Sequence, residues 1–193
     1  MLHNKYSEVL RQFLTDYGKE LYGRGLIGKV PLSQKGIALA LQELEKKGIL
    51  KSKKEGNIKF YRLDLTSPEA KDTIILTEIA NKIEFFKKHK KIAYILKKDE
   101  RVVGIFGSYA KGTEKTDSDI DIFIIGGKKK QDYDIQGKIY DLNISTVYFS
   151  EKEFWKLIKE KNNLCKEIIN SHIIIFGIER FVNIILRGYY GFD

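Results

Sequence analysis

Residues 103–125 constrain the fold of this chain more than any other stretch. Two apolar runs in it indicate strands, and the segment that joins them begins with Gly107 and Ser108. The second run carries aspartates at positions 119 and 121. Because side chains alternate along a strand, Asp119 and Asp121 would share one face while Ile120 and Ile122 point into a core. The pattern predicts strand, glycine turn, short helix, loop and strand.

The residue types at these positions indicate binding of a cation and of phosphate. Two carboxylates held side by side repel each other, so the pair favours a bound cation, and hard oxygen ligands suit Mg²⁺. At the turn, free backbone N–H groups at a helix start and the hydroxyl of Ser108 would form a cradle for phosphate. A phosphate cradle followed by a metal-binding pair is typical of phosphoryl or nucleotidyl transfer.

The stretch resembles the signature of the DNA polymerase β-type nucleotidyltransferase superfamily, which is Gly-Ser, a short spacer and Asp-apolar-Asp. The form found here, Gly-Ser-Tyr-Ala-Lys-Gly leading to Ser-Asp-Ile-Asp, is similar to the minimal nucleotidyltransferases of archaea and bacteria. The resemblance implies an α+β chain whose C-terminal α/β domain has a mixed sheet, and a nucleoside triphosphate, with ATP expected, as substrate or ligand. It also implies Asp119 and Asp121 as catalytic ligands of Mg²⁺ or Mn²⁺, and Gly107, Ser108, Lys111 and Ser118 as nucleotide-binding residues.

Active members of the superfamily place a third carboxylate on the next strand, which alternation predicts over residues 138–149. By the register of the resemblance, Asn143 occupies that position. An amide can ligate a metal, but it brings no charge and cannot act as a base. Asp141 lies on the same side of the predicted strand, roughly 6.6 Å from Asn143. It would supply the third carboxylate only if the strand had a different register. Nucleotide binding is therefore expected, and catalysis of nucleotidyl transfer stays an open question.

The pattern of apolar and capping residues over 1–66 predicts a separate domain. Helical spacing and caps predict helices over 3–17, over 20–27 and between the N-cap Ser33 and Gly48. Strand-like runs follow at 49–53 and 58–63, on either side of a Glu-Gly-Asn turn.

Three helices and a hairpin in this order resemble the winged helix-turn-helix family, in which the third helix enters the DNA major groove and the hairpin contacts phosphates. The resemblance implies DNA-contacting residues at the start of the third helix and around the hairpin tip. These are Ser33, Gln34, Lys35, Lys51, Lys53, Lys54 and Lys59.

Between the two domains, Ser67 and Pro68 predict the start of a linking helix that runs to about His89. Its apolar side would pack on one domain or form the seam of a homodimer. The expected division is a winged domain over 1–66, a helical linker over 67–95 and a nucleotidyltransferase domain over 96–193. The predicted apolar side comprises Ile75, Ile79, Ile83 and Phe86.

Farther along, the sequence predicts a loop over 128–134, a capping box at Ser150 and Glu153, and a strand over 173–176.

The composition limits the classes of binding partner and the cellular location that we expect for this chain. The net charge is +9, and residues 1–67 hold 13 basic against 7 acidic side chains, which favours a nucleic-acid partner for that part. The sequence has no apolar run long enough to span a membrane and no signal-peptide core, so a cytoplasmic location is expected. The single cysteine, Cys165, excludes an internal disulfide and a Cys-based zinc site.

Three functions stay open. The first is a Mg²⁺-dependent nucleotidyltransferase that moves a nucleoside monophosphate to a hydroxyl of a protein or nucleic acid. The second is a DNA-binding regulator whose second domain binds nucleotide without catalysis. The third rests on the resemblance alone: minimal nucleotidyltransferases are often antitoxins paired with HEPN-type toxin proteins.

Overall fold

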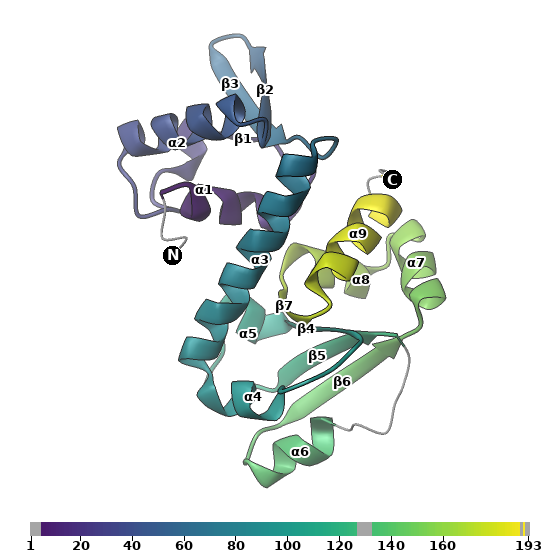
Figure 1. Cartoon of the computed structure of the whole chain (residues 1–193). Coiled ribbons are helices and arrows are strands. Elements are labelled where there is room, and N and C mark those ends of the chain that lie inside the picture. The colour runs from purple at the N-terminus through teal and green to yellow at the C-terminus, as the bar shows by residue number, and fades with distance from the viewer. Residues whose placement is uncertain (1–4, 127–132, 190, 192–193) are drawn as a thin grey trace. The chain divides into compact units, whose positions relative to one another are not determined.

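Figure 1 shows the computed structural model of the protein, which describes residues 5–126, 133–189 and 191. The chain divides into two compact units, one that ends at Thr77 and one that runs from Glu78 to Gly191. The division falls within helix α3 (Pro68–Lys88), and each unit is described by itself. Among the described residues, no helix combines the length and the apolar character needed to cross a membrane.

The first unit joins helices to a three-stranded antiparallel sheet of order β1-β3-β2. The predicted helix over 20–27 is wrong, because Leu21 and Tyr22 pair with Tyr61 and Phe60 and a 3₁₀ turn follows. Strand pairing overrides the local helical pattern here. The elements are α1 (Lys5–Leu14), β1 (Leu21–Tyr22), η1 (Gly23–Leu26), α2 (Gln34–Lys46), β2 (Leu50–Glu55) and β3 (Ile58–Leu63).

Helix α1 ends three residues before the predicted position, and its predicted start at His3 lies outside the described residues. Helix α2 follows the prediction closely. The hydroxyl of Ser33 accepts a hydrogen bond from the backbone N–H of Gly36 at 3.2 Å, which caps the helix start. The predicted apolar stripe is confirmed, since Ile37, Ala40, Leu41 and Leu44 are all buried.

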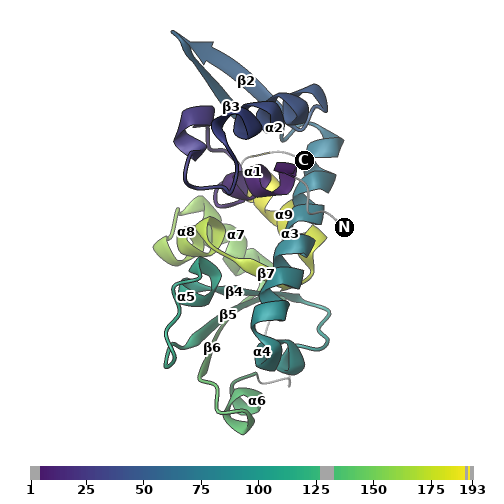
Figure 2. The same cartoon turned by 90° about the vertical axis from the view of Figure 1, so that its left-hand side faces the viewer.

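Strands β2 and β3 form a hairpin with a two-residue loop, Gly56 and Asn57 (Figure 2). Gly56 has φ +57°, a conformation that a tight hairpin loop requires and glycine adopts readily. Strand β3 has the predicted bounds, whereas β2 begins one residue after and ends two residues after the predicted run over 49–53. Pairing extends from Leu50 with Leu63 to Glu55 with Ile58.

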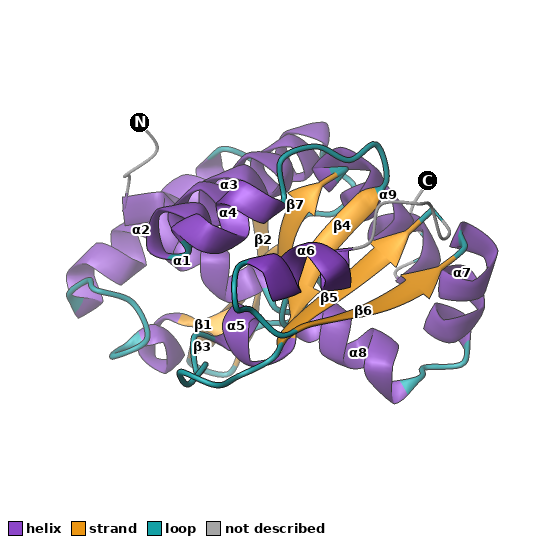
Figure 3. Ribbon diagram, turned by 90° about the horizontal axis from the view of Figure 1, so that it is seen from below, coloured by secondary structure: helices purple, strands orange, loops and turns teal. Residues whose placement is uncertain are grey.

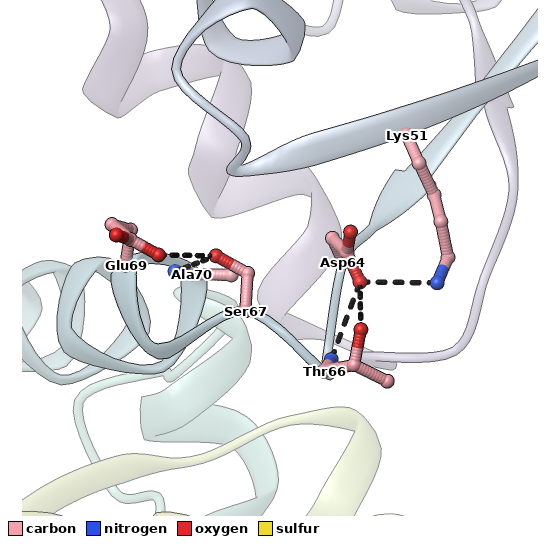
Figure 4. Close-up of polar contacts among 6 residues, drawn as sticks. All are labelled: Lys51, Asp64, Thr66, Ser67, Glu69 and Ala70. Atoms are coloured by element: carbon pink, nitrogen blue, oxygen red, sulfur yellow. Dashed lines mark hydrogen bonds and ion pairs between the residues drawn. The ribbon is translucent and has the colours of Figure 1, made fainter.

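Figure 4 shows how the chain leaves the hairpin and enters α3. The carboxylate of Asp64 accepts hydrogen bonds from the Nζ atom of Lys51 at 3.0 Å and from the hydroxyl of Thr66 at 2.7 Å. The hydroxyl of Ser67 then accepts from the backbone N–H of Ala70 at 3.3 Å, so Ser67 caps α3 and Pro68 is its first residue, as predicted.

The predicted apolar side of α3 is buried only in part, since Phe86 packs against the core cluster of the second unit and Ile75 is half-buried. Ile79 and Ile83 are 38% and 50% exposed, whereas Ile74 and Phe85 are buried. Apolar residues occur all around this helix, so spacing alone selects no unique face. Glu78, at the start of the second unit, is also buried and lies 3.2 Å from the Nε2 atom of His172.

The second unit is built on a mixed four-stranded sheet of order β6-β5-β4-β7 (Figure 3). Strands β5 and β6 are parallel, and the other two pairs are antiparallel. The strands are β4 (Val102–Phe106), β5 (Ile120–Ile125), β6 (Ile144–Phe149) and β7 (Ile173–Phe176), and the helices besides α3 are α4 (Lys90–Ile95), α5 (Gly107–Lys111), α6 (Tyr133–Ile139), α7 (Glu151–Lys159), α8 (Asn163–Asn170) and α9 (Ile178–Tyr189).

The third predicted strand is too long. Residues 138 and 139 end α6, and a turn at 140–142 precedes β6. The backbone N–H groups of Tyr140 and Leu142 both donate to the carbonyl of Gly137, which closes this turn. Tyr140 and Leu142 pack against the core, so their spacing imitates a strand. Of the predicted loop over 128–134, residues 133 and 134 belong to α6 and the others lie outside the described residues.

The two faces of the sheet carry different side chains. Ile105, Ile122 and Ile124 pack with residues of α3, α4 and α6 in one core cluster. Phe123 faces the other way and contacts Phe181 of α9, with ring centroids 5.7 Å apart. The capping box that opens α7 and the strand over 173–176 are both confirmed.

A buried ionic network holds the segment before β4. The side chains of Asp99 and Arg101 are both 3% exposed, and Asp99 accepts hydrogen bonds from Arg101 and from the hydroxyl of Tyr133. Burial opposes ionisation of Asp99, but these hydrogen bonds and the guanidinium charge outweigh burial and lower its pKa to about 2.

Asp99→Asn should therefore destabilise the protein at pH 7 by on the order of 3 kcal/mol, because it leaves Arg101 buried without its counter-ion. A depressed pKa contributes stability above the unfolded pKa and loses it as pH falls, so the deficit should narrow between about pH 5 and pH 2. Urea denaturation at several pH values measures this. Asp72→Asn, at an exposed position of α3, is the control, and a deficit that does not change with pH would contradict the assignment.

Candidate functional site

The turn after β4 brings the backbone against a carboxylate. Phe106 pairs with Asp121 across the sheet, and Gly107 then adopts φ +69° to begin α5. A Cβ atom added at Gly107 would fall well inside van der Waals contact of the Oδ2 atom of Asp121. The position therefore needs glycine for its conformation and for its close approach to Asp121.

Asp119 and Asp121 lie at the start of β5. Asp121 is partly buried and Asp119, one residue before the strand, is exposed. The intervening Ile120 is fully buried in the core cluster on the opposite face, as predicted. Burial raises the pKa of Asp121, and the charges of Asp119 and Glu167 raise it further. The carboxylates therefore repel each other in the absence of a cation.

The loop into β5 is held by Ser118. Its hydroxyl accepts a hydrogen bond from the backbone N–H of Lys115 at 2.8 Å, and its own N–H donates to the carbonyl of Lys115. Ser118 thus closes the turn before Asp119. At the other end of the loop, Gly112 has φ +67° and ends α5.

Lys111, at the end of α5, forms an ion pair that the sequence did not indicate. Its Nζ atom lies 2.7 Å from the Oε1 atom of Glu167 on α8, and both side chains are nearly half exposed. Lys111 lowers the pKa of Asp121 and thereby partly offsets the acidic neighbours. The two partners are 56 residues apart in the chain, so no local pattern could have joined them.

The parallel pairing of β5 with β6 gives the location of Asn143, the predicted third-carboxylate position. Ile120 pairs with Ile144, so Asn143 lies level with Asp119, and its carbonyl accepts a hydrogen bond from the N–H of Ile120 at 2.8 Å. Asp141 lies in the preceding turn with φ +55° and is exposed. Within 5–126, 133–189 and 191, no three His, Cys, Asp or Glu side chains come together as a metal-binding group.

The predicted DNA-contacting residues lie in the first unit. Gln34 and Lys35 are exposed in the first turn of α2 after Ser33, and Lys54 is exposed on β2. The other three hairpin lysines are engaged with acidic neighbours. These ion pairs join Lys51 to Asp64 at 3.0 Å, Lys53 to Glu20 at 2.7 Å and to Glu55 at 3.0 Å, and Lys59 to Glu45 at 2.7 Å.

Comparison with known proteins agrees with the geometry of the second unit. The family model described as polymerase beta, nucleotidyltransferase, matches residues 81–180, which is more than half of the chain. No curated protein and no solved structure matches the chain. The matched region includes Gly107, Ser108, Asp119 and Asp121, and the chain therefore belongs to the polymerase β nucleotidyltransferase family.

Proposed function

We propose that the second unit is a Mg²⁺-dependent nucleotidyltransferase that moves a nucleoside monophosphate from a triphosphate, with ATP preferred, to a hydroxyl of a protein or nucleic acid. The observation that carries this proposal is the carboxylate pair of Asp119 and Asp121 against the Gly107 turn, together with the raised pKa of Asp121. Mutual repulsion at a partly buried pair is relieved by a divalent cation.

The donor set fits a hard cation. Asp119 and Asp121 would hold Mg²⁺, and Asn143, which the register places level with Asp119, would offer a neutral amide oxygen. The metal, when bound, supplies charge neutralisation on the triphosphate. The residues offer no third carboxylate at the position of Asn143, so the attacking hydroxyl would be activated without a base there.

The phosphates would lie along the Gly107 turn. Helix α5 has only five residues, so its dipole is small, and binding would depend on the local N–H groups and the hydroxyl of Ser108. Lys111 would contribute its charge by leaving Glu167 for a phosphate oxygen. Such preorganised donors act on the charge that grows on the leaving pyrophosphate.

Thermal unfolding tests nucleotide and metal binding. ATP with Mg²⁺ should raise the melting temperature of the wild type and leave that of Asp121→Asn unchanged. Without metal, Asp121→Asn should melt above the wild type, by roughly 2–4 °C for each kcal/mol of repulsion relieved. Asp117→Asn, at an exposed position in the loop before β5, should respond as the wild type does. Stabilisation of Asp121→Asn by Mg²⁺ and ATP would contradict the proposed role of the pair.

Label transfer from α-labelled ATP to hydroxyl-bearing proteins and oligonucleotides tests turnover. Asp119→Asn should abolish transfer. Asn143→Asp should raise the rate on the order of 10²-fold, the size of the contribution that a positioned general base makes. Asp141→Asn, in the adjacent turn, should leave the rate unchanged. No transfer to any acceptor by the wild type or by Asn143→Asp would reject the transferase.

A DNA-binding role for the first unit is a second candidate, since the capped start of α2 presents Gln34 and Lys35 to solvent and Lys54 is exposed on β2 of the same unit. The arrangement of helices and hairpin is compatible with a winged helix. This unit would then direct the transferase, or a nucleotide-binding regulator, to DNA.

If DNA binds there, its affinity should fall steeply with salt, because lysines displace counter-ions from phosphates. Lys35→Gln and Lys54→Gln should each reduce the salt slope by about one, whereas the exposed Lys152→Gln on α7 should not. Fluorescence anisotropy with labelled duplexes between about 50 and 200 mM salt measures the slope. A slope equal to that of the wild type in both variants would place the DNA elsewhere.

A further inference from the structure

His172 lies between the end of α8 and the start of β7, and both of its ring nitrogens face hydrogen-bond acceptors. The Nδ1 atom lies 2.8 Å from the carbonyl oxygen of Ile168 and 3.0 Å from that of Ile169. The Nε2 atom lies 3.2 Å from the Oε1 atom of Glu78 on α3. Because a neutral imidazole can donate from one nitrogen only, carbonyls on one side and a carboxylate on the other favour the imidazolium, which donates from both.

The pair of His172 and Glu78 is buried within the second unit. The two side chains are 3% and 1% exposed, and the ring of Phe181 on α9 lies against His172 with centroids 4.8 Å apart. Burial opposes the charged form, but the charge and hydrogen bond of Glu78 and the two carbonyls of α8 outweigh burial and raise the pKa of His172. Among the residues that the structure describes, no other charged side chain contributes to this shift.

The imidazole also satisfies the end of α8. The last carbonyl groups of a helix have no partner within the helix, and Ile168 and Ile169 lie in the last turn of α8. A positive charge at this end of a helix is favoured by the helix dipole. One protonated ring therefore caps α8 and joins it to a buried carboxylate of α3.

Helix α8 also contributes to the candidate site. Glu167, which directly precedes Ile168, pairs with Lys111 at the end of α5. The carbonyl groups that bind His172 and the carboxylate that binds Lys111 therefore belong to the same turn of α8. A change in the position of this turn would change the distance between Glu167 and Lys111.

We propose that His172 and Glu78 form a proton-dependent latch, which fixes the end of α8 to α3 while His172 is protonated and releases it when the proton is lost. Without the proton, Glu78 is a buried charge that has lost its counter-ion, which is strongly destabilising. A raised folded pKa contributes stability that is fully present below the ordinary value of about 6.5 and is lost as pH rises through the folded value. The latch therefore opens on the alkaline side and loosens the hold of Glu167 on Lys111.

Nitrogen-15 NMR of the imidazole rings in the full chain tests the protonation state, with His172→Gln to assign the signals. At pH 7, His172 should show two protonated ring nitrogens. His89, whose pKa burial lowers, should show one and serves as the internal reference. A single protonated nitrogen on His172 at pH 7 would overturn the latch, because the ring would then be neutral.

Urea denaturation between pH 5 and pH 8 tests the coupling to stability. The folding equilibrium constant of the wild type should fall by about tenfold per pH unit above pH 6.5, since the native state holds one more proton. Glu78→Gln removes the counter-ion, so burial should lower the pKa of His172 and this variant should instead lose stability below about pH 6.5. His89→Gln should keep the wild-type slope above pH 6.5. Equal slopes in the wild type and Glu78→Gln would overturn the latch.

Hydrogen exchange at pH 7 tests the release of α8. The amides of α8 should exchange at least tenfold faster in His172→Gln than in the wild type, whereas those of α7 should not change. Glu160→Gln, at the exposed end of α7, should leave α8 as it is in the wild type. Unchanged exchange of α8 in a folded His172→Gln would overturn the latch. These measurements use no nucleotide, so their outcome is independent of the proposed transferase.

Discussion

The close approach of the Gly107 backbone to the carboxylate of Asp121 is the constraint on which the site depends. It requires a positive φ at Gly107, no side chain there, and antiparallel pairing of β4 with β5 so that Phe106 lies opposite Asp121. The sheet supplies that pairing through a core of isoleucines on its other face. Packing on one side of the sheet thus holds two repelling charges on the other. Burial, and then the charges of Asp119 and Glu167, raise the pKa of Asp121.

The parts of the fold that local chemistry determines could be predicted from the sequence. The caps at Ser33, Ser67 and Ser150 mark real helix starts, because a hydroxyl at these positions binds a backbone N–H of the first turn. The position of the aspartate pair at the start of β5 could also be predicted, because two acidic residues two positions apart at the edge of an apolar run are uncommon in a purely structural strand. Family membership followed from the same residues.

What sequence reasoning missed depends on tertiary pairing. The helix expected over 20–27 became β1 because Leu21 and Tyr22 find partners on β3. The turn at 140–142 imitated a strand because its apolar residues face the same core that a strand would. The ion pair between Lys111 and Glu167 has no local signature either, since its partners are 56 residues apart in the chain.

The ion pair between Lys111 and Glu167 has a consequence for how ionic strength acts on the site. A solvated lysine carries mobile anions that a triphosphate must displace, and their release makes binding steeply sensitive to salt. Lys111 already has a fixed anion 2.7 Å away, the carboxylate of Glu167. A phosphate that binds Lys111 would therefore replace one bound anion with another. Added salt also screens the exposed pair and loosens its hold on the lysine. If the proposed triphosphate binds at this turn, the two effects oppose each other, and its affinity changes little with the ionic strength.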